Sequence, residues 1–171
     1  MMLGKGRWMP GLLCGLGLMV LAMPGMAQSV EFDLQGHRGA RGLMPENSHV
    51  GFIHAMELGV TTLELDLVLT KDGVLIVNHD RFLDPDRVRD PKGNWVSGEL
   101  AETPILKLTS RQLKGLQIGR VQQNSRIAKR FPDQAQLDDV PFLHLEHLLY
   151  MAELRSNRTM RYNIELKRSP L

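Results

Sequence analysis

The sequence lacks the features on which several protein classes depend. It has one cysteine in 171 residues, so it can form no internal disulfide, and it holds no CxxC pair for a zinc or redox site. Its 21 Lys and Arg residues nearly balance its 19 Asp and Glu residues, and a net charge of +2 provides no basic surface for nucleic acid. The apolar fraction of 43% is ordinary for a folded domain. A disulfide scaffold, a zinc finger, a disordered tail and a DNA-binding module are therefore excluded.

The first 27 residues have the layout of a targeting segment. They contain no acidic residue, carry Lys5 and Arg7 near their start and continue with an apolar run over 12–23. Gly25 and Ala27 supply the small side chains that precede a signal peptidase cut. We therefore expect a signal peptide over 1–27 that is cleaved after Ala27, and a periplasmic or secreted protein.

The apolar run also bears on membrane attachment. A membrane span needs about 20 apolar residues, whereas the run over 12–23 is shorter and is interrupted by Gly15 and Gly17. An uncleaved anchor is the alternative, but we expect no stable membrane anchor. Cleavage would remove Cys14 and two of the 21 basic residues, while all 19 acidic residues remain. The mature chain would be neutral and free of cysteine, which suits an oxidising compartment.

Strand and helix patterns alternate in the first part of the mature chain. Residues 30–35 alternate apolar and polar side chains and predict a strand, and the β-branched and apolar stretch 61–70 predicts another. Between them, Asn47 or Ser48 can cap a helix over 49–58. Strand, helix and strand in this order predict an α/β fold with a parallel sheet.

The second strand is expected to turn back as a hairpin. Lys71-Asp72-Gly73 is a turn signal, and 74–78 would form the return strand. The stretch 81–143 contains many prolines and little periodicity, so we expect a loop-rich insertion there. Its one predicted helix covers 110–116 and would be capped by Thr109. After it, periodicity predicts a helix over 144–155 and a third core strand over 161–166.

Two carboxylates share one face of the second predicted strand. Glu64 and Asp66 are two residues apart, so their side chains point to the same side of a strand. Two like charges among Leu, Val and Thr are costly unless they are compensated, and a hard divalent cation is the obvious compensator. Glu165 on the third strand could be a further ligand. The alternative is that the pair forms the solvent face of an ordinary amphipathic strand.

Two histidines follow predicted strands at turns. His37 comes after the first strand and His79 after the hairpin, and such a pair could act as general base and general acid near neutral pH. Each could equally be an ordinary loop or core histidine. Arg38 and Lys167 would provide positive charge for a phosphoryl oxygen, or could be surface cations.

Taken together and in order, these residues resemble a known enzyme family, the glycerophosphodiester phosphodiesterases. The segments that carry the resemblance are Gly36-His37-Arg38-Gly39, Pro45-Glu46-Asn47-Ser48, Glu64-Leu65-Asp66, Leu69-Thr70-Lys71-Asp72-Gly73, Asn78-His79-Asp80 and Ile164-Glu165-Leu166-Lys167. It covers about 30–171, and 120–134 also resembles the insertion of exported bacterial members. Ser48 stands where the family usually has Thr, which also caps helices.

The resemblance implies a fold, a reaction and a site. The family is a (β/α)₈ TIM barrel of the phospholipase C-like phosphodiesterase type, with its site at the carboxyl ends of the strands. The implied reaction of lipid and glycerol metabolism cleaves a small-molecule glycerophosphodiester, through a cyclic phosphate, to glycerol 3-phosphate and an alcohol. A related lipid phosphodiesterase or phospholipase is the alternative. The implied site comprises an acid–base pair, three ligands for one Ca²⁺ or Mg²⁺ and two phosphate-binding cations: His37 and His79; Glu64, Asp66 and Glu165; Arg38 and Lys167.

Length sets a further expectation. Such a barrel typically needs ~250 residues, and 28–171 is shorter and contains the insertion. We therefore expect 28–171 to be the N-terminal portion of the phosphodiesterase domain, in which three barrel strands leave exposed edges. An inactive truncated fragment is thus an alternative to an active enzyme. The sequence leaves the oligomeric state open.

Overall fold

The computed structural model describes residues 32–167. The signal peptide expected over 1–27 lies outside these residues. Within 32–167, no helix combines the length and the apolar character that crossing a membrane requires.

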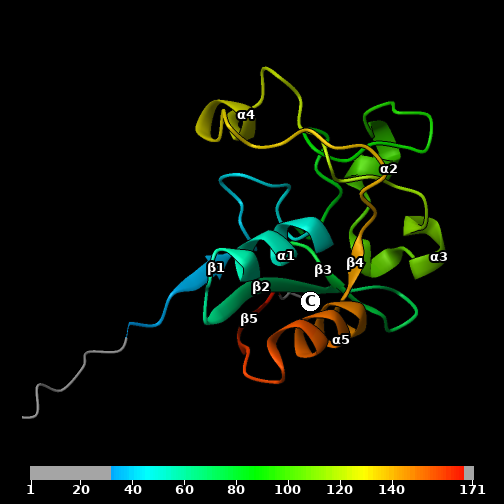
Figure 1. Cartoon of the computed structure of the whole chain (residues 1–171). Coiled ribbons are helices and arrows are strands. Elements are labelled where there is room, and N and C mark those ends of the chain that lie inside the picture. The colour runs from blue at the N-terminus through cyan, green and yellow to red at the C-terminus, as the bar shows by residue number, and fades with distance from the viewer. Residues whose placement is uncertain (1–31, 168–171) are drawn as a thin grey trace, which may run out of the picture. The chain divides into compact units, whose positions relative to one another are not determined.

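Three parallel strands form the centre of the sheet (Figure 1). β2 (Thr62–Leu69) lies between β1 (Gln35–His37) and β5 (Arg161–Leu166), and both neighbours run parallel to it. β3 (Leu75–Val77) turns back antiparallel along the end of β2, as the hairpin signal predicts, and β4 (Leu143–His144) pairs with β3. The expected α/β class with a parallel core is confirmed, and the five-stranded sheet is open.

Two helices pack on one face of these strands. α1 (His49–Glu57) begins at Ser48, whose Oγ accepts a hydrogen bond from the Gly51 amide at 3.0 Å. α5 (Leu145–Ser156) precedes β5. The buried side chains shared by the helices and the sheet include Phe52, Ala55, Leu63, Leu65, Leu67, Leu148 and Ala152. Because alternate leucines of β2 face the helices, the residues between them point to the opposite side of the sheet.

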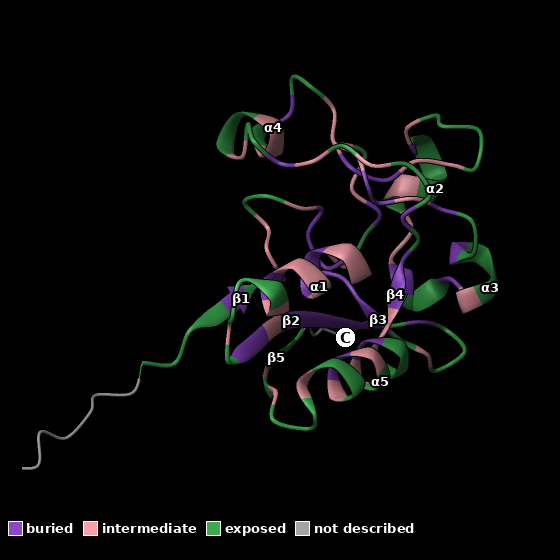
Figure 2. Cartoon of the chain, viewed as in Figure 1, coloured by how far each residue is buried: buried purple, intermediate pink, exposed green. Residues whose placement is uncertain are grey.

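The region 81–142 has more structure than the sequence predicts. It contains α2 (Gly98–Glu102), the 3₁₀ turn η1 (Ile105–Lys107), α3 (Ser110–Leu113) and α4 (Arg126–Arg130). Only α3 is expected, and its predicted cap is confirmed by a capping box at Thr109. Elements of three to five residues are too short to leave a periodic signal. An apolar cluster holds α2, η1 and α3 instead, through Ala101, Ile105 and Leu113, whereas α4 has no buried residue. The other cluster members in this region are Leu83, Val88, Val96, Leu108, Leu116, Ile118, Val140 and Phe142. Figure 2 shows buried segments running through the region.

The first strand is displaced from its predicted position. The alternation predicts a strand over 30–35 followed by a loop, but β1 covers Gln35–His37 and residues 32–34 are irregular. Phe32 and Leu34, which create the alternation, are 82% and 54% exposed and have no core to face. Pairing with β2 sets the strand instead, since Gln35 lies opposite Thr62. His37 is consequently the last residue of a strand and not a loop residue.

Candidate active site

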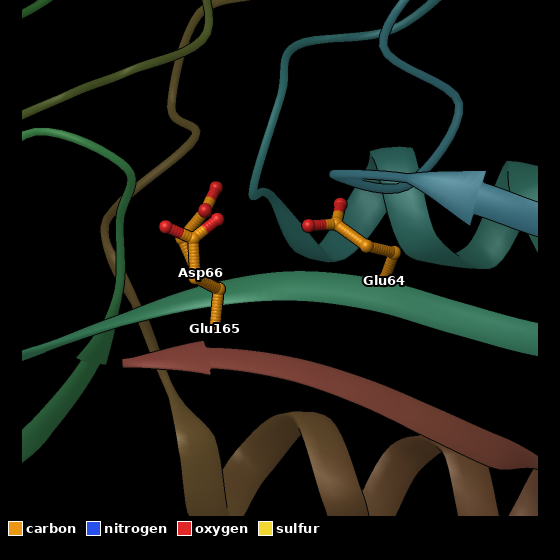
Figure 3. Close-up of side chains that lie close together, drawn as sticks. All are labelled: Glu64, Asp66 and Glu165. Carbon is orange, nitrogen blue, oxygen red and sulfur yellow. The ribbon is translucent and has the colours of Figure 1, made fainter. Parts of the chain in front are cut away.

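Three carboxylates converge on one side of β2 and β5. Glu64 and Asp66 extend from β2, and Glu165 lies opposite Asp66 in the parallel register of β5. Each offers an oxygen within 4.8 Å of the other two. Figure 3 shows the three side chains pointing away from α5. The structure therefore brings together the three carboxylates that the sequence proposes as ligands.

This donor set fits a hard divalent cation. Carboxylate oxygens are the ligands that Mg²⁺ and Ca²⁺ prefer. Two basic side chains already share the cluster: Lys167 contacts Glu165 and places its Nζ 3.1 Å from Asp66 Oδ1, and Arg38 Nε lies 3.2 Å from Asp66 Oδ2. Three carboxylates against two cations leave the cluster negative, which favours a bound cation.

Asp66 stays ionised although it is buried. Burial by itself raises the pKa of this carboxyl group. A hydrogen bond from Asn47, the contact with Lys167 and the charge of Arg38 together outweigh burial, so the pKa of Asp66 lies below its ordinary value. Burial likewise lowers the pKa of Lys167, but its bonds to Glu165 and Asp66 outweigh that effect and raise it. At neutral pH, Asp66 is therefore a carboxylate and Lys167 an ammonium.

A tight turn after β1 places Arg38 and His37 against Glu64. Arg38 has a left-handed φ of +54°, and its backbone amide donates to Glu64 Oε2 at 2.8 Å. Gly39 follows at φ +80°, and a Cβ there would lie 2.7 Å from the Gly51 carbonyl carbon, so glycine is required. His37 Nε2 lies 3.9 Å from the same Glu64 oxygen, with 61% of its side chain exposed. Glu64 thus holds the turn through the Arg38 amide and lies near the imidazole of His37, which remains accessible.

His79 stands on the turn after β3. Its Nδ1 lies 2.9 Å from Asp80 Oδ1, which leaves Nε2 available for proton transfer. Asn78 fixes this turn with two hydrogen bonds. Its backbone N–H donates to the Asp66 backbone carbonyl at 3.0 Å, and its side-chain Nδ2 donates to the Asp80 backbone carbonyl at 2.6 Å. His79 is therefore tied to the strand that carries two of the carboxylates.

Two cavities border His79. One, of about 330 Å³, is lined by His79 together with Glu165 and Lys167. The other, of about 540 Å³, is lined by His79 and Arg38 among others. His37 lines neither, and joins the cluster through Glu64. His79 thus borders two cavities, one shared with Glu165 and Lys167 and the other with Arg38.

Four functional neighbours are missed by sequence reasoning: Glu46, Asn47, Asn78 and Arg87. Glu46 is buried and pairs with Arg38 at 3.1 Å, and Asn47 Nδ2 donates to Asp66 at 3.1 Å. Both lie in the segment 45–48, which sequence analysis treats as a helix start and as part of the family resemblance but to which it assigns no role in the site. Arg87 lies within the insertion and has no motif around it.

Substitution of the buried Arg87 by methionine is expected to destabilise the fold. The side chain is 2% exposed, donates to Asn78 Oδ1 and places its Nε 3.8 Å from Glu46 Oε1. Loss of the guanidinium leaves Asn78 without that partner, while Glu46 keeps Arg38. We expect a loss of about 3 kcal/mol in the free energy of unfolding, the lower end for a broken buried pair. Urea denaturation measures it against Arg111→Met, on the exposed side of α3; equal midpoints would refute a structural role for Arg87.

Comparison with known proteins gives a consistent result. Residues 37–170 match the model of the Glycerophosphoryl diester phosphodiesterase family. Over 57 residues the chain is 47% identical to a glycerophosphodiester phosphodiesterase of Bacillus altitudinis. This stretch covers 33% of this chain and 22% of that protein.

Solved structures agree on the fold. A Silicibacter pomeroyi DSS-3 protein that carries the glycerophosphoryl diester phosphodiesterase name is 35% identical, with a TM-score of 0.75 over 80% of this chain and 45% of that one. An Oleispira antarctica phosphodiesterase in complex with the product sn-glycerol-3-phosphate has a TM-score of 0.53 and 24% identity over 80% and 44% of the two chains. The matched part spans less than half the length of each relative. These neighbours are TIM-barrel enzymes, and the open α/β sheet of this chain is consistent with part of such a barrel.

Proposed function

Because the chain belongs to the glycerophosphoryl diester phosphodiesterase family, we propose that it catalyses the metal-dependent hydrolysis of glycerophosphodiesters to glycerol 3-phosphate and an alcohol. The observation that carries the proposal is the convergence of three carboxylates with Arg38 and Lys167 beside His79. The product found in the Oleispira antarctica structure supports a small-molecule substrate.

The charged residues would bind and orient the phosphate. Arg38 and Lys167 reach the carboxylate cluster from two different segments, so a phosphate beside Asp66 could meet both cations. Glu64, Asp66 and Glu165 would hold one Ca²⁺ or Mg²⁺. When bound, this ion lowers the pKa of the glycerol hydroxyl and neutralises charge on the phosphoryl oxygens.

The two histidines would move the protons. One removes the proton from the glycerol hydroxyl next to the phosphate, and that oxygen attacks phosphorus to form a cyclic phosphate. The bond to the alcohol breaks, and the other histidine donates a proton to the departing oxygen. Water then opens the ring with the two roles reversed. His79 suits proton donation because Asp80 holds its Nδ1 and leaves Nε2 directed elsewhere.

Export is a separate proposal. Residues 1–27 would direct the chain to the periplasm or to the outside of the cell, and the N-terminal sequence of the exported protein would then begin at Gln28. An N-terminus at Met1 in the exported material would contradict cleavage.

Product analysis of the full chain tests the proposed function. We expect glycerol 3-phosphate from glycerophosphocholine, no product after EDTA treatment, and recovery with Ca²⁺ or Mg²⁺. A buffer-only reaction and a mock preparation without the chain, taken through the same EDTA treatment and Ca²⁺ or Mg²⁺ addition, control for contaminating phosphodiesterase. Preference for lysophospholipid micelles would move the assignment to a lipid phosphodiesterase. A cooperatively folded chain that releases no product from either substrate would contradict the proposal.

A further inference from the structure

The larger cavity beside His79 extends to the insertion. Its volume of about 540 Å³ lies within the range of small-molecule sites, roughly 300–1,000 Å³. Arg38 and His79 line it on the side of the carboxylate cluster, and Arg126, Ile127 and Arg130 of α4 also line it. A group bound next to His79 would therefore also meet the side chains of α4.

Several charges in this cavity neutralise one another. Glu46 pairs with Arg38 at 3.1 Å and with Arg41 at 2.5 Å. Asp80 pairs with His79 at 2.9 Å. Both carboxylates are thus already engaged by basic groups of the strand-end turns, and neither is paired with α4.

The arginines of α4 keep their charge for a ligand. In the part of the chain that the structure describes, neither Arg126 nor Arg130 forms an ion pair with a carboxylate, and Arg130 instead lies 5.4 Å from the centroid of the Phe131 ring. The remaining acid in the cavity is Asp84, whose Oδ1 accepts a hydrogen bond from the Asp86 amide at 2.9 Å and which, among the described residues, forms no ion pair with either arginine of α4. The α4 wall is therefore positively charged.

We propose that Arg126 and Arg130 form a subsite for a negatively charged group on the alcohol portion of the substrate. The inference rests on the proposed function, since a phosphodiester held by Arg38 beside His79 would extend one of its two ester arms into this cavity. Guanidinium groups match carboxylate and phosphate oxygens in charge and geometry. The preferred substrates would be glycerophosphodiesters whose alcohol carries a carboxylate or a phosphate.

Two substrates that differ by one carboxylate test the subsite. Glycerophosphoserine and glycerophosphoethanolamine are compared by kcat/KM for the full chain and for the double variant Arg126→Gln, Arg130→Gln. We expect the unaltered chain to prefer the serine compound, and the double variant to reduce the serine-to-ethanolamine ratio about three- to tenfold, as partly exposed ion pairs allow. Lys129→Gln is the matched control, because Lys129 lies on the same helix but does not line the cavity.

An unchanged ratio in the double variant, or an equal fall in Lys129→Gln, would overturn the subsite. If neither compound is hydrolysed, the proposed function fails, and calorimetric binding of the same two compounds decides the subsite separately. Tighter binding of glycerophosphoserine that is lost in the double variant would support it. Equal binding of the two compounds would overturn it.

Discussion

Replacement of His79 by glutamine is expected to lower the rate of glycerol 3-phosphate release from glycerophosphocholine by about a hundred- to ten-thousandfold, the usual contribution of a positioned general acid or base. Glutamine retains a polar side chain but cannot transfer the proton. Because His79 lies on an ordered turn tied to Asp66 through Asn78, the loss would reflect chemistry and not a displaced loop. His147→Gln on α5, an exposed histidine away from the carboxylates, should leave the rate unchanged.

A better leaving group identifies which histidine is the acid. The p-nitrophenyl ester of glycerol phosphate releases an alcohol that needs no protonation, so the loss in His79→Gln should shrink if His79 donates the proton. His37→Gln should lose as much activity with this ester as with glycerophosphocholine. The cavity proposed to take the alcohol portion of the substrate is lined by His79 and not by His37, which favours His79 as the group that protonates the departing alcohol. The reverse pattern would exchange the two roles, and full activity in a folded His79→Gln variant would remove His79 from the mechanism.

Replacement of Asp66 by asparagine is expected to remove cation binding and activity together. Asp66 is the most buried of the three carboxylates and the one that both Arg38 and Lys167 contact. Loss of a direct ligand should weaken the affinity for Ca²⁺ or Mg²⁺ by more than the roughly 10- to 100-fold that a change in an outer partner causes. Stability should also fall by about 3 kcal/mol, because Arg38 and Lys167 lose the buried charge between them and keep only Glu46 and Glu165 as partners.

A second carboxylate separates the two effects. Glu165 is exposed, so Glu165→Gln should weaken cation binding while the free energy of unfolding in EDTA stays within about 0.5 kcal/mol of the unaltered chain. Calorimetric titration and urea unfolding measure the two quantities, with Glu57→Gln on the exposed side of α1 as the control. Unchanged cation affinity in both folded variants would show that the cluster is a structural ion-pair network.

Patterns over short stretches of sequence predict much of this molecule correctly. The alternation in β2 places Glu64 and Asp66 on one face, and an Asp-Gly turn predicts the hairpin to β3. Ser48 and Thr109 are the caps that their positions suggest. Each of these features depends on residues only a few positions apart, so the sequence contains all the information that they require.

The region 81–142 could be predicted only in part. Prolines and weak periodicity indicate loops, yet an apolar cluster holds α2, η1 and α3 in place there. The partners in that cluster are separated by up to several tens of residues, so no local pattern reports them. α4 contributes no residue to that cluster, and its place beside His79, which creates the charged cavity wall, is likewise reported by no local pattern.

The sequence by itself determined which chemical groups the chain carries and on which faces of its strands they lie. Strand periodicity, turn residues and the resemblance in motif order were sufficient for that. Only the tertiary structure decided that β1 includes His37, that Glu165 aligns with Asp66, and that the buried Arg87 reaches Glu46. These outcomes depend on strand register and on desolvated charge pairs between distant segments, whose energies exist only once the chain is folded.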